Sequence, residues 1–313
     1  MQQKTDELSL VELGTLIGEY RREKGIGEVE LYQGICTRAK GRRLEQGQKA
    51  IDEWQLQLIL SRLHIQPYLC DCALSRQQFL IRERRMQLER SLSLKRTEEA
   101  RVELEQYRRE IQAESNPSQQ QYILWKEAQI AELTCKARSE EPKSDVGELF
   151  RAALSISMPT GVLERQLTRS SLIAQEEIEM YLGYRFYSCS MSYAEYEAIL
   201  SFFEKYLLSA DFYSAVYAEA GERCVRLLME QEDWEEAELV CHRVLEVLKE
   251  YSIGSGQPEL YLLLARIRRS LPSSGESTEP ESRECYRMAY YVALALGEEK
   301  QAALAKEQLP DGE

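Results

Sequence analysis

Apolar residues recur at helical spacing along almost the whole chain, and no segment sustains an alternation of apolar and polar residues. An early example is Leu13, Ile17 and Tyr20, which are spaced i, i+4 and i+7 and would share one face of a helix. Only 8 prolines and 16 glycines interrupt 313 residues, and good helix formers such as Leu, Glu, Ala and Arg dominate. The sequence therefore predicts an all-α protein with long helices and few turns.

Charge is unevenly distributed along the chain. The net charge is −13, yet residues 1–110 carry 20 Lys and Arg against 18 Asp and Glu, whereas the remaining residues carry 20 against 35. An acidic surface repels nucleic acid. Any contact with DNA is therefore expected in the N-terminal part of the chain.

The cysteine and histidine content gives no sign of metal chemistry. None of the eight cysteines forms a CxxC pair, and only two histidines are present, so no metal site and no cofactor are expected. The polar start of the chain shows no secretion signal, and the apolar runs fall short of the ~20 residues that a membrane-spanning helix needs. We expect a cytoplasmic protein with free thiols and no membrane contact.

Residues 9–66 are predicted to form five short helices. The second would span residues 28–35 and the third residues 38–46, with Thr37 as the capping residue of the third. Two short helices joined by a tight turn are the helix-turn-helix plan, in which the second helix of the pair enters the major groove of DNA. Pro67 marks the end of this region.

The predicted third helix and the turn after it are strongly basic. Five cations lie within twelve residues, against a single acid, Glu45, which we expect to pair internally with Arg21 or Arg43. Arginine can bind guanine through two hydrogen bonds, and further cations contact phosphates. The residues predicted to contact DNA are Thr37, Arg38, Lys40, Arg42 and Arg43.

The chain changes character beyond Pro67. Residues 75–94 form a strongly charged helix, which we interpret as a connector whose charges either face solvent or follow the DNA backbone. From about residue 95 helical hairpins repeat. TEEA at residues 97–100 and DWEEA at residues 233–237 each place a polar turn before a small alanine that lets neighbouring helices approach. This is half of a tetratricopeptide motif, and such hairpins stack into a solenoid with a concave surface.

Three strings in the N-terminal part resemble the Xre-type helix-turn-helix of the Rgg/PlcR/PrgX peptide-receptor regulators (the RRNPP family) of Gram-positive bacteria. They are Leu13-Gly14-x2-Ile17-x3-Arg21-x3-Gly25, Glu30-Leu31-x2-Gly34-Ile35-Cys36 and Arg43-Leu44-Glu45-x-Gly47. A more diffuse similarity to the early repeats of that family lies at Leu149-x4-Leu154-x3-Met158-Pro159 and Leu172-Ile173-x3-Glu177. The resemblance implies a homodimeric transcription regulator whose repeats bind a short, imported signalling peptide.

This resemblance suggests three domains. They are an Xre-type helix-turn-helix DNA-binding domain at residues 1–67, a connector helix at 68–94, and a tetratricopeptide-like domain for peptide binding and dimerisation at 95–313. The expected partners are double-stranded operator DNA, a short signalling peptide of the quorum-sensing type and a second copy of the chain.

Two features depart from the family pattern. Gly27 and Glu28 stand where the family usually has Ser-Gln, so a carboxylate replaces an amide that often faces DNA. Gly41 lies inside the predicted recognition helix, where glycine costs about 1 kcal/mol relative to alanine. Both changes keep a second hypothesis open, namely a protein-interaction scaffold or anti-activator whose head no longer binds DNA.

The peptide site, if present, must differ from the usual one. Family members often clamp the peptide with asparagines, but this chain has a single asparagine, Asn116. Residues 181–217 are rich in tyrosine and phenylalanine, which either pack between helices or line a pocket for the peptide. Two arginines could bind a carboxylate. The candidate peptide-binding residues are Arg151, Arg169, Tyr181, Tyr184, Tyr213 and Tyr217.

No catalytic arrangement stands out in the sequence. It contains neither a Gly-rich phosphate loop nor a GxSxG motif. The paired glutamates at residues 98–99 and 235–236 precede predicted helices, where the helix dipole favours acidic side chains. We therefore do not expect an enzyme.

Overall fold

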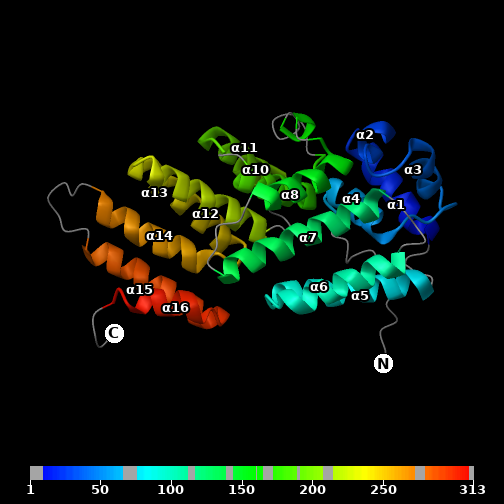
Figure 1. Ribbon diagram of the computed structural model, residues 1–313. Coiled ribbons are helices and arrows are strands. Elements are labelled where there is room, and N and C mark those ends of the chain that lie inside the picture. The colour runs from blue at the N-terminus through cyan, green and yellow to red at the C-terminus, as the bar shows by residue number, and fades with distance from the viewer. Residues whose placement is uncertain are drawn as a thin grey trace, which may run out of the picture. The chain divides into compact units, whose positions relative to one another are not determined.

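The computed structural model of the chain describes residues 10–65, 76–111, 117–138, 144–159, 161–164, 172–188, 191–206, 214–271 and 279–309. In these ranges every regular element is a helix, which confirms the predicted all-α class (Figure 1). None of the described helices is both long and apolar enough to cross a membrane. The chain folds into two compact units, residues 1–190 and 191–313.

The head of the first unit contains four helices within residues 10–65. They are α1 (Leu10–Glu23), α2 (Glu28–Tyr32), α3 (Arg38–Glu45) and α4 (Glu53–Arg62). The prediction of five helices is wrong, because the left-handed Gly47 follows the end of α3 and the backbone stays irregular until Asp52 caps α4. The second helix ends at Tyr32, before the left-handed Gly34, and is therefore shorter than predicted.

The four helices of the head enclose a shared apolar core. Each contributes side chains from its inner face, and burial of a large aliphatic side chain stabilises a fold by about 1.5–3 kcal/mol. The fully or nearly fully buried members are Leu13, Ile17, Leu31, Leu44, Trp54, Leu58 and Ile59. Leu13 and Ile17 are thus buried on one face of α1, as their spacing predicts, whereas Tyr20, expected on the same face, is exposed.

Five further labelled helices complete the first unit. They are α5 (Arg76–Ser93), α6 (Thr97–Ile111), α7 (Pro117–Arg138), α8 (Ser144–Ser157) and α10 (Gln175–Ser188). Consecutive helices pack as hairpins, α5 with α6 and α7 with α8, and α8 also packs against α10 (Figure 1). Ala100, the small residue of the predicted motif, is fully buried near the start of α6. A side chain of this size lets neighbouring helices pack closely.

The second unit is a regular run of helices. They are α11 (Tyr193–Tyr206), α12 (Ser214–Glu230), α13 (Trp234–Glu250), α14 (Gln257–Ser270), α15 (Glu279–Leu296) and α16 (Glu299–Lys306). Each helix packs against the next, and α12 and α14 also touch, as do α14 and α16. Asp233 caps α13, and Ala237, Cys241 and Leu245 are buried behind it. This is the tetratricopeptide-like packing that the sequence predicts at residues 233–237.

Candidate nucleic-acid interface

The helix predicted to enter DNA, α3, begins at Thr37. The Thr37 hydroxyl accepts a hydrogen bond from the Lys40 backbone N–H at 3.3 Å, which supplies the cap expected from the sequence. Leu44 on the inner face is fully buried, whereas Arg38, Arg42 and Arg43 on the outer face are exposed. The helix is therefore fixed from inside and presents guanidinium groups outward.

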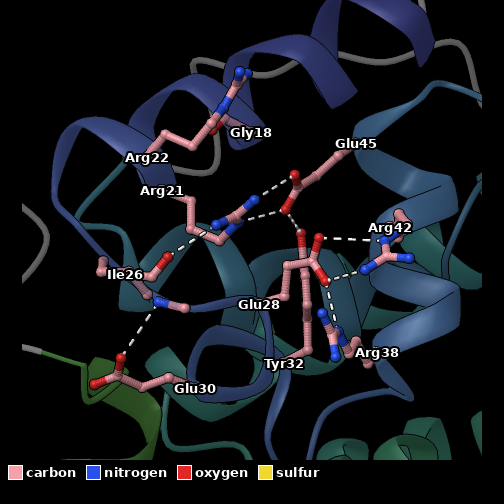
Figure 2. Close-up of polar contacts among 11 residues, drawn as sticks. Gly18, Arg21, Arg22, Ile26, Glu28, Glu30, Tyr32, Arg38, Arg42 and Glu45 are labelled. Atoms are coloured by element: carbon pink, nitrogen blue, oxygen red, sulfur yellow. Dashed lines mark hydrogen bonds and ion pairs between the residues drawn. The ribbon is translucent and has the colours of Figure 1, made fainter.

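The inner face of α3 is held by a polar contact as well as by apolar packing. The Arg21 guanidinium donates to both carboxylate oxygens of Glu45 at 2.6 and 2.9 Å, and the Tyr32 hydroxyl donates to the same carboxylate at 2.7 Å (Figure 2). Burial raises the pKa of Glu45, but the hydrogen bonds from Arg21 and Tyr32 outweigh it and leave the pKa lowered. The predicted internal pairing of Glu45 is confirmed, with Arg21 as the partner.

Gly41 has a packing role that the sequence does not reveal. A Cβ atom at this position would overlap the ring of Tyr32, which lies directly against the α3 backbone. Tyr32 is nearly fully buried. The glycine is therefore the residue that lets α2 and α3 cross closely, and its cost in helix propensity is offset by this contact.

The acidic residue Glu28 lies against the outer face of α3. Its carboxylate accepts from Arg38 Nε at 2.7 Å, from Arg42 Nη2 at 2.8 Å and from Arg42 Nε at 3.3 Å (Figure 2). The side chains of Arg38 and Arg42 remain 60% and 52% exposed, whereas that of Glu28 is 19% exposed. Hydrogen bonds from Arg42 and then Arg38 lower the pKa of Glu28 to about 2. We call this arrangement the Glu28 fork.

The other two predicted cations differ from the fork arginines. Lys40 Nζ donates to the side-chain carbonyl of Gln55 on α4 at 2.6 Å, so this ammonium points toward the interior of the head. Gln55 in turn donates to the Ile35 carbonyl at 2.7 Å. Arg43 is exposed and has no polar partner within the described part of the chain. The predicted DNA-binding residues thus include one cap, two arginines in the fork, one partly buried lysine and one arginine open to solvent.

The opposite side of the head is joined to the helices that follow it by a buried ion pair. Arg62 at the end of α4 donates to Glu177 of α10 at 2.6 Å, and both side chains are at most 1% exposed. The same guanidinium donates to the carbonyls of Leu31 in the last turn of α2 and of Gln33 directly after that helix, at 3.0 and 2.8 Å. Arg62 therefore links the helix-turn-helix turn directly to α10.

A chain of amide and hydroxyl groups extends this junction. The Trp54 indole N–H donates to the Gln121 carbonyl at 3.2 Å, Gln121 donates to the Ser157 hydroxyl at 2.6 Å, and Ser157 donates to Glu177 at 2.7 Å. All these side chains are buried. Buried polar groups are tolerated when each has a partner, and such a network fixes the relative placement of α4, α7, α8 and α10 within the first unit.

The charged helix α5 contributes one more group to this junction. The Arg85 guanidinium carbon lies 4.5 Å from the ring centroid of Tyr122 and 5.8 Å from that of Trp54, and Arg85 Nε donates to the Tyr107 hydroxyl at 2.9 Å. Its neighbour Arg84 pairs with Glu103 and Glu110 of α6. For Arg85 the predicted alternatives of a solvated charge or a phosphate contact are both wrong, because aromatic rings enclose it.

The candidate peptide-binding residues that the structure describes belong to both compact units. Tyr181 is fully buried and donates to Glu164 at 3.3 Å, Tyr184 is partly buried, and the exposed Arg151 pairs with Glu148 in the preceding turn of α8. Tyr217 belongs to the second unit, where it is buried and donates to Glu204 at 2.8 Å. Arg169 and Tyr213 lie outside the described residues. A peptide site formed by these side chains stays a prediction.

No group of three or more His, Cys, Asp or Glu side chains in the described ranges could hold a metal ion. The described cysteines, Cys36, Cys135, Cys224, Cys241 and Cys285, are free thiols. Burial raises the pKa of Cys224 and of Cys241 to about 12, so neither is a reactive thiolate near neutral pH.

The chain is an all-α protein with a helix-turn-helix head and tetratricopeptide-like repeats. The head presents a capped cationic helix that packs against the short α2, and stacked helical hairpins follow it. No protein-family model and no curated protein matches the chain.

The chain is similar to several solved structures over nearly its whole length. The chain is similar to PlcR of Bacillus thuringiensis in complex with the peptide PapR7 and DNA, with 17% identity, a TM-score of 0.49, and 96% of this chain and 100% of that chain covered. It is similar to the apo form of the competence regulator ComR of Streptococcus vestibularis, with 16% identity, a TM-score of 0.48, and 96% and 98% covered. ComR of S. thermophilus with DNA and its signalling peptide ComS gives 15% identity, a TM-score of 0.46, and 94% and 97% covered.

Proposed function

We propose that this protein is a transcription regulator that binds operator DNA through α3. The observation that carries the proposal is the outer face of this helix, where Arg38, Arg42 and Arg43 are exposed while Leu44 and Gly41 fix the inner face. A recognition helix needs this combination of a fixed backbone and outward donors. The acidic composition beyond residue 110 supports placing the DNA contact in the head. The proposal involves no catalytic step and places the protein in the cytoplasm, with its DNA.

The proposal includes a second copy of the chain and a short signalling peptide. Each head of the dimer would bind one DNA half-site. The distance between the two recognition helices would then set the spacing of the half-sites. Peptide binding to the repeats would shift the population of conformers and so change that spacing. The support for the peptide is the sequence resemblance to the peptide-receptor regulators, together with the tyrosine-rich helices around Tyr184.

The DNA contact is tested by fluorescence anisotropy with the duplex that lies upstream of the gene and with a scrambled duplex of equal length. We expect tighter binding to the upstream duplex at moderate salt, and weaker binding by Arg38→Ala, Arg42→Ala and Arg43→Ala. Arg226→Ala is the matched control, because Arg226 is an exposed arginine of α12 whose one ion-pair partner among the described residues is the nearby Glu222. Equal affinity for both duplexes at moderate salt would exclude sequence-specific regulation.

The alternative is a protein-interaction scaffold or anti-activator without DNA binding. The Glu28 fork favours it, because one carboxylate neutralises much of the positive charge of two arginines on the face that would meet DNA. The same anisotropy measurement separates the two functions. A head that has lost DNA binding would bind neither duplex even at low salt, where attraction to phosphates is strongest.

A further inference from the structure

The two arginines of the Glu28 fork use different edges of their guanidinium groups. Arg38 contacts the carboxylate only through Nε, and neither of its Nη atoms has a hydrogen-bond partner in the part of the chain that the structure describes. Arg42 contacts it through Nε and Nη2 together, at 3.3 and 2.8 Å. Arg38 therefore keeps its terminal pair of nitrogens free, whereas Arg42 keeps a single fully free nitrogen, Nη1.

These free edges suit different parts of DNA. The terminal Nη1 and Nη2 donors of an arginine match the O6 and N7 acceptors of guanine in the major groove, and this bidentate pair carries sequence information. A single remaining donor suits a phosphate oxygen, which positions the protein without reading sequence. The two side chains lie at i and i+4 on α3, so both reach the same groove from one face of the helix.

The carboxylate also changes the free energy with which the two arginines bind DNA. An unpaired arginine loses much of its rotamer freedom when it meets a base, and a side chain that is already held loses less. At the same time, a negative charge on this face weakens the attraction of α3 for phosphates of any sequence. Both effects favour discrimination between sequences over affinity for DNA in general.

We propose that Glu28 is a positioning residue that presents Arg38 to a guanine in the major groove and leaves Arg42 for a phosphate, an inference that rests on the proposed DNA-binding function. Glu28 itself touches no base in this arrangement. The acid that seemed unfavourable beside DNA is thereby the residue that makes the head selective.

The test starts with selection from a duplex library with a randomised core. The wild-type protein should enrich sequences with a fixed guanine in each half-site. Replacing that guanine by 7-deazaguanine, which lacks the N7 acceptor, should weaken wild-type binding but should not affect Arg38→Ala further. Arg38→Ala should lose discrimination at this position by about fivefold to 150-fold, the range of a bidentate arginine–guanine pair.

The other variants separate the roles within the fork. Arg42→Ala should weaken binding to enriched and random duplexes equally and lower the slope of log K against log salt by about 1. Glu28→Gln should bind random duplex more tightly. It should reduce discrimination at the guanine position by at least about fivefold, the lower end of the range for a bidentate arginine–guanine pair. Glu19→Gln is the matched control, since it removes an exposed acid of α1 with the same change in net charge, and its discrimination should equal that of the wild type.

The outcomes distinguish this inference from the proposed function. If the wild type enriches no sequence and binds no duplex, both fail. If the wild type enriches a guanine but Glu28→Gln discriminates as well as the wild type, or as well as Glu19→Gln, only the role of Glu28 is overturned. Circular dichroism melts of each variant identify any unfolding, and Glu28→Ala provides a second removal of the carboxylate, for which the same loss of discrimination is expected.

Discussion

Two arginine–glutamate contacts of the head have similar lengths but opposite surroundings. In the Glu28 fork, Arg42 donates to Glu28 at 2.8 Å and about half of the arginine side chain is exposed. At the junction with α10, Arg62 donates to Glu177 at 2.6 Å and both side chains are buried. Water or a phosphate can replace a partner in the first contact, whereas nothing can do so in the second. The length of an ion pair therefore does not indicate its contribution, because burial decides what happens when one partner is lost.

The largest effect is expected from breaking the buried pair. Glu177→Ala leaves the Arg62 guanidinium unpaired in the interior and should lower the free energy of unfolding by about 3–5 kcal/mol, measured by urea denaturation. The double variant Arg62→Met with Glu177→Leu should recover only part of that loss, because it removes the unpaired charge but leaves the Leu31 and Gln33 carbonyls and the Ser157 hydroxyl without their partners. A loss of less than about 1 kcal/mol in the single variant would mean that water reaches the junction.

An intermediate effect is expected at the crossing of α2 and α3. Gly41→Ala would force a methyl group against the Tyr32 ring and should destabilise the head by about 1–3 kcal/mol, as overpacking does. Alanine in an exposed helix would instead stabilise by about 1 kcal/mol, so the sign of the change decides between packing and propensity. Gly161→Ala is the control, because no atom lies within 4 Å of its added Cβ. In thermal melts, the melting temperature of Gly41→Ala should fall, whereas that of Gly161→Ala should rise or stay the same.

The smallest effect on stability is expected from the exposed contact. Glu28→Gln should change the melting temperature only slightly near neutral pH, because solvent screens both arginines. The folded-state pKa of Glu28 is lowered from 4.5 to about 2, so its contribution is complete above the unfolded-state pKa and is lost as pH falls from about 4.5 to about 2. The difference between variant and wild type should therefore shrink as melts are repeated at progressively lower pH. A difference in melting temperature that grows on acidification would contradict the ion pairs of Glu28 with Arg38 and Arg42.

The sequence is a good guide to contacts whose partners lie within one motif. Helical spacing predicts the burial of Leu13 and Ile17 on α1, the cap at Thr37 follows from residue type, and the charge of Glu45 predicts an internal arginine partner. In each of these cases a local rule about spacing, capping or charge is enough. The buried alanines near the starts of α6 and α13 follow from the same kind of rule.

The sequence is a poor guide where a residue's role depends on a distant neighbour. Arg62 and Glu177 are 115 residues apart, and no local pattern links them. Glu28 and Gly41 both look unfavourable when they are considered alone. The carboxylate becomes a brace only when Arg38 and Arg42 face it, and the glycine becomes necessary only when the Tyr32 ring lies on it. The residues of the peptide site are predicted from residue type alone, and no spacing, capping or charge rule connects them.

The junction through Arg62 limits how this head could be exchanged between proteins. A fragment ending near residue 67 would expose Trp54 and leave Arg62 without Glu177, so it should fold poorly or precipitate. A hybrid protein that borrows the proposed DNA specificity would therefore have to borrow residues 1–190 as a whole. The transferable unit is thus several times larger than the four-helix head, and recombination within it should rarely give a working protein.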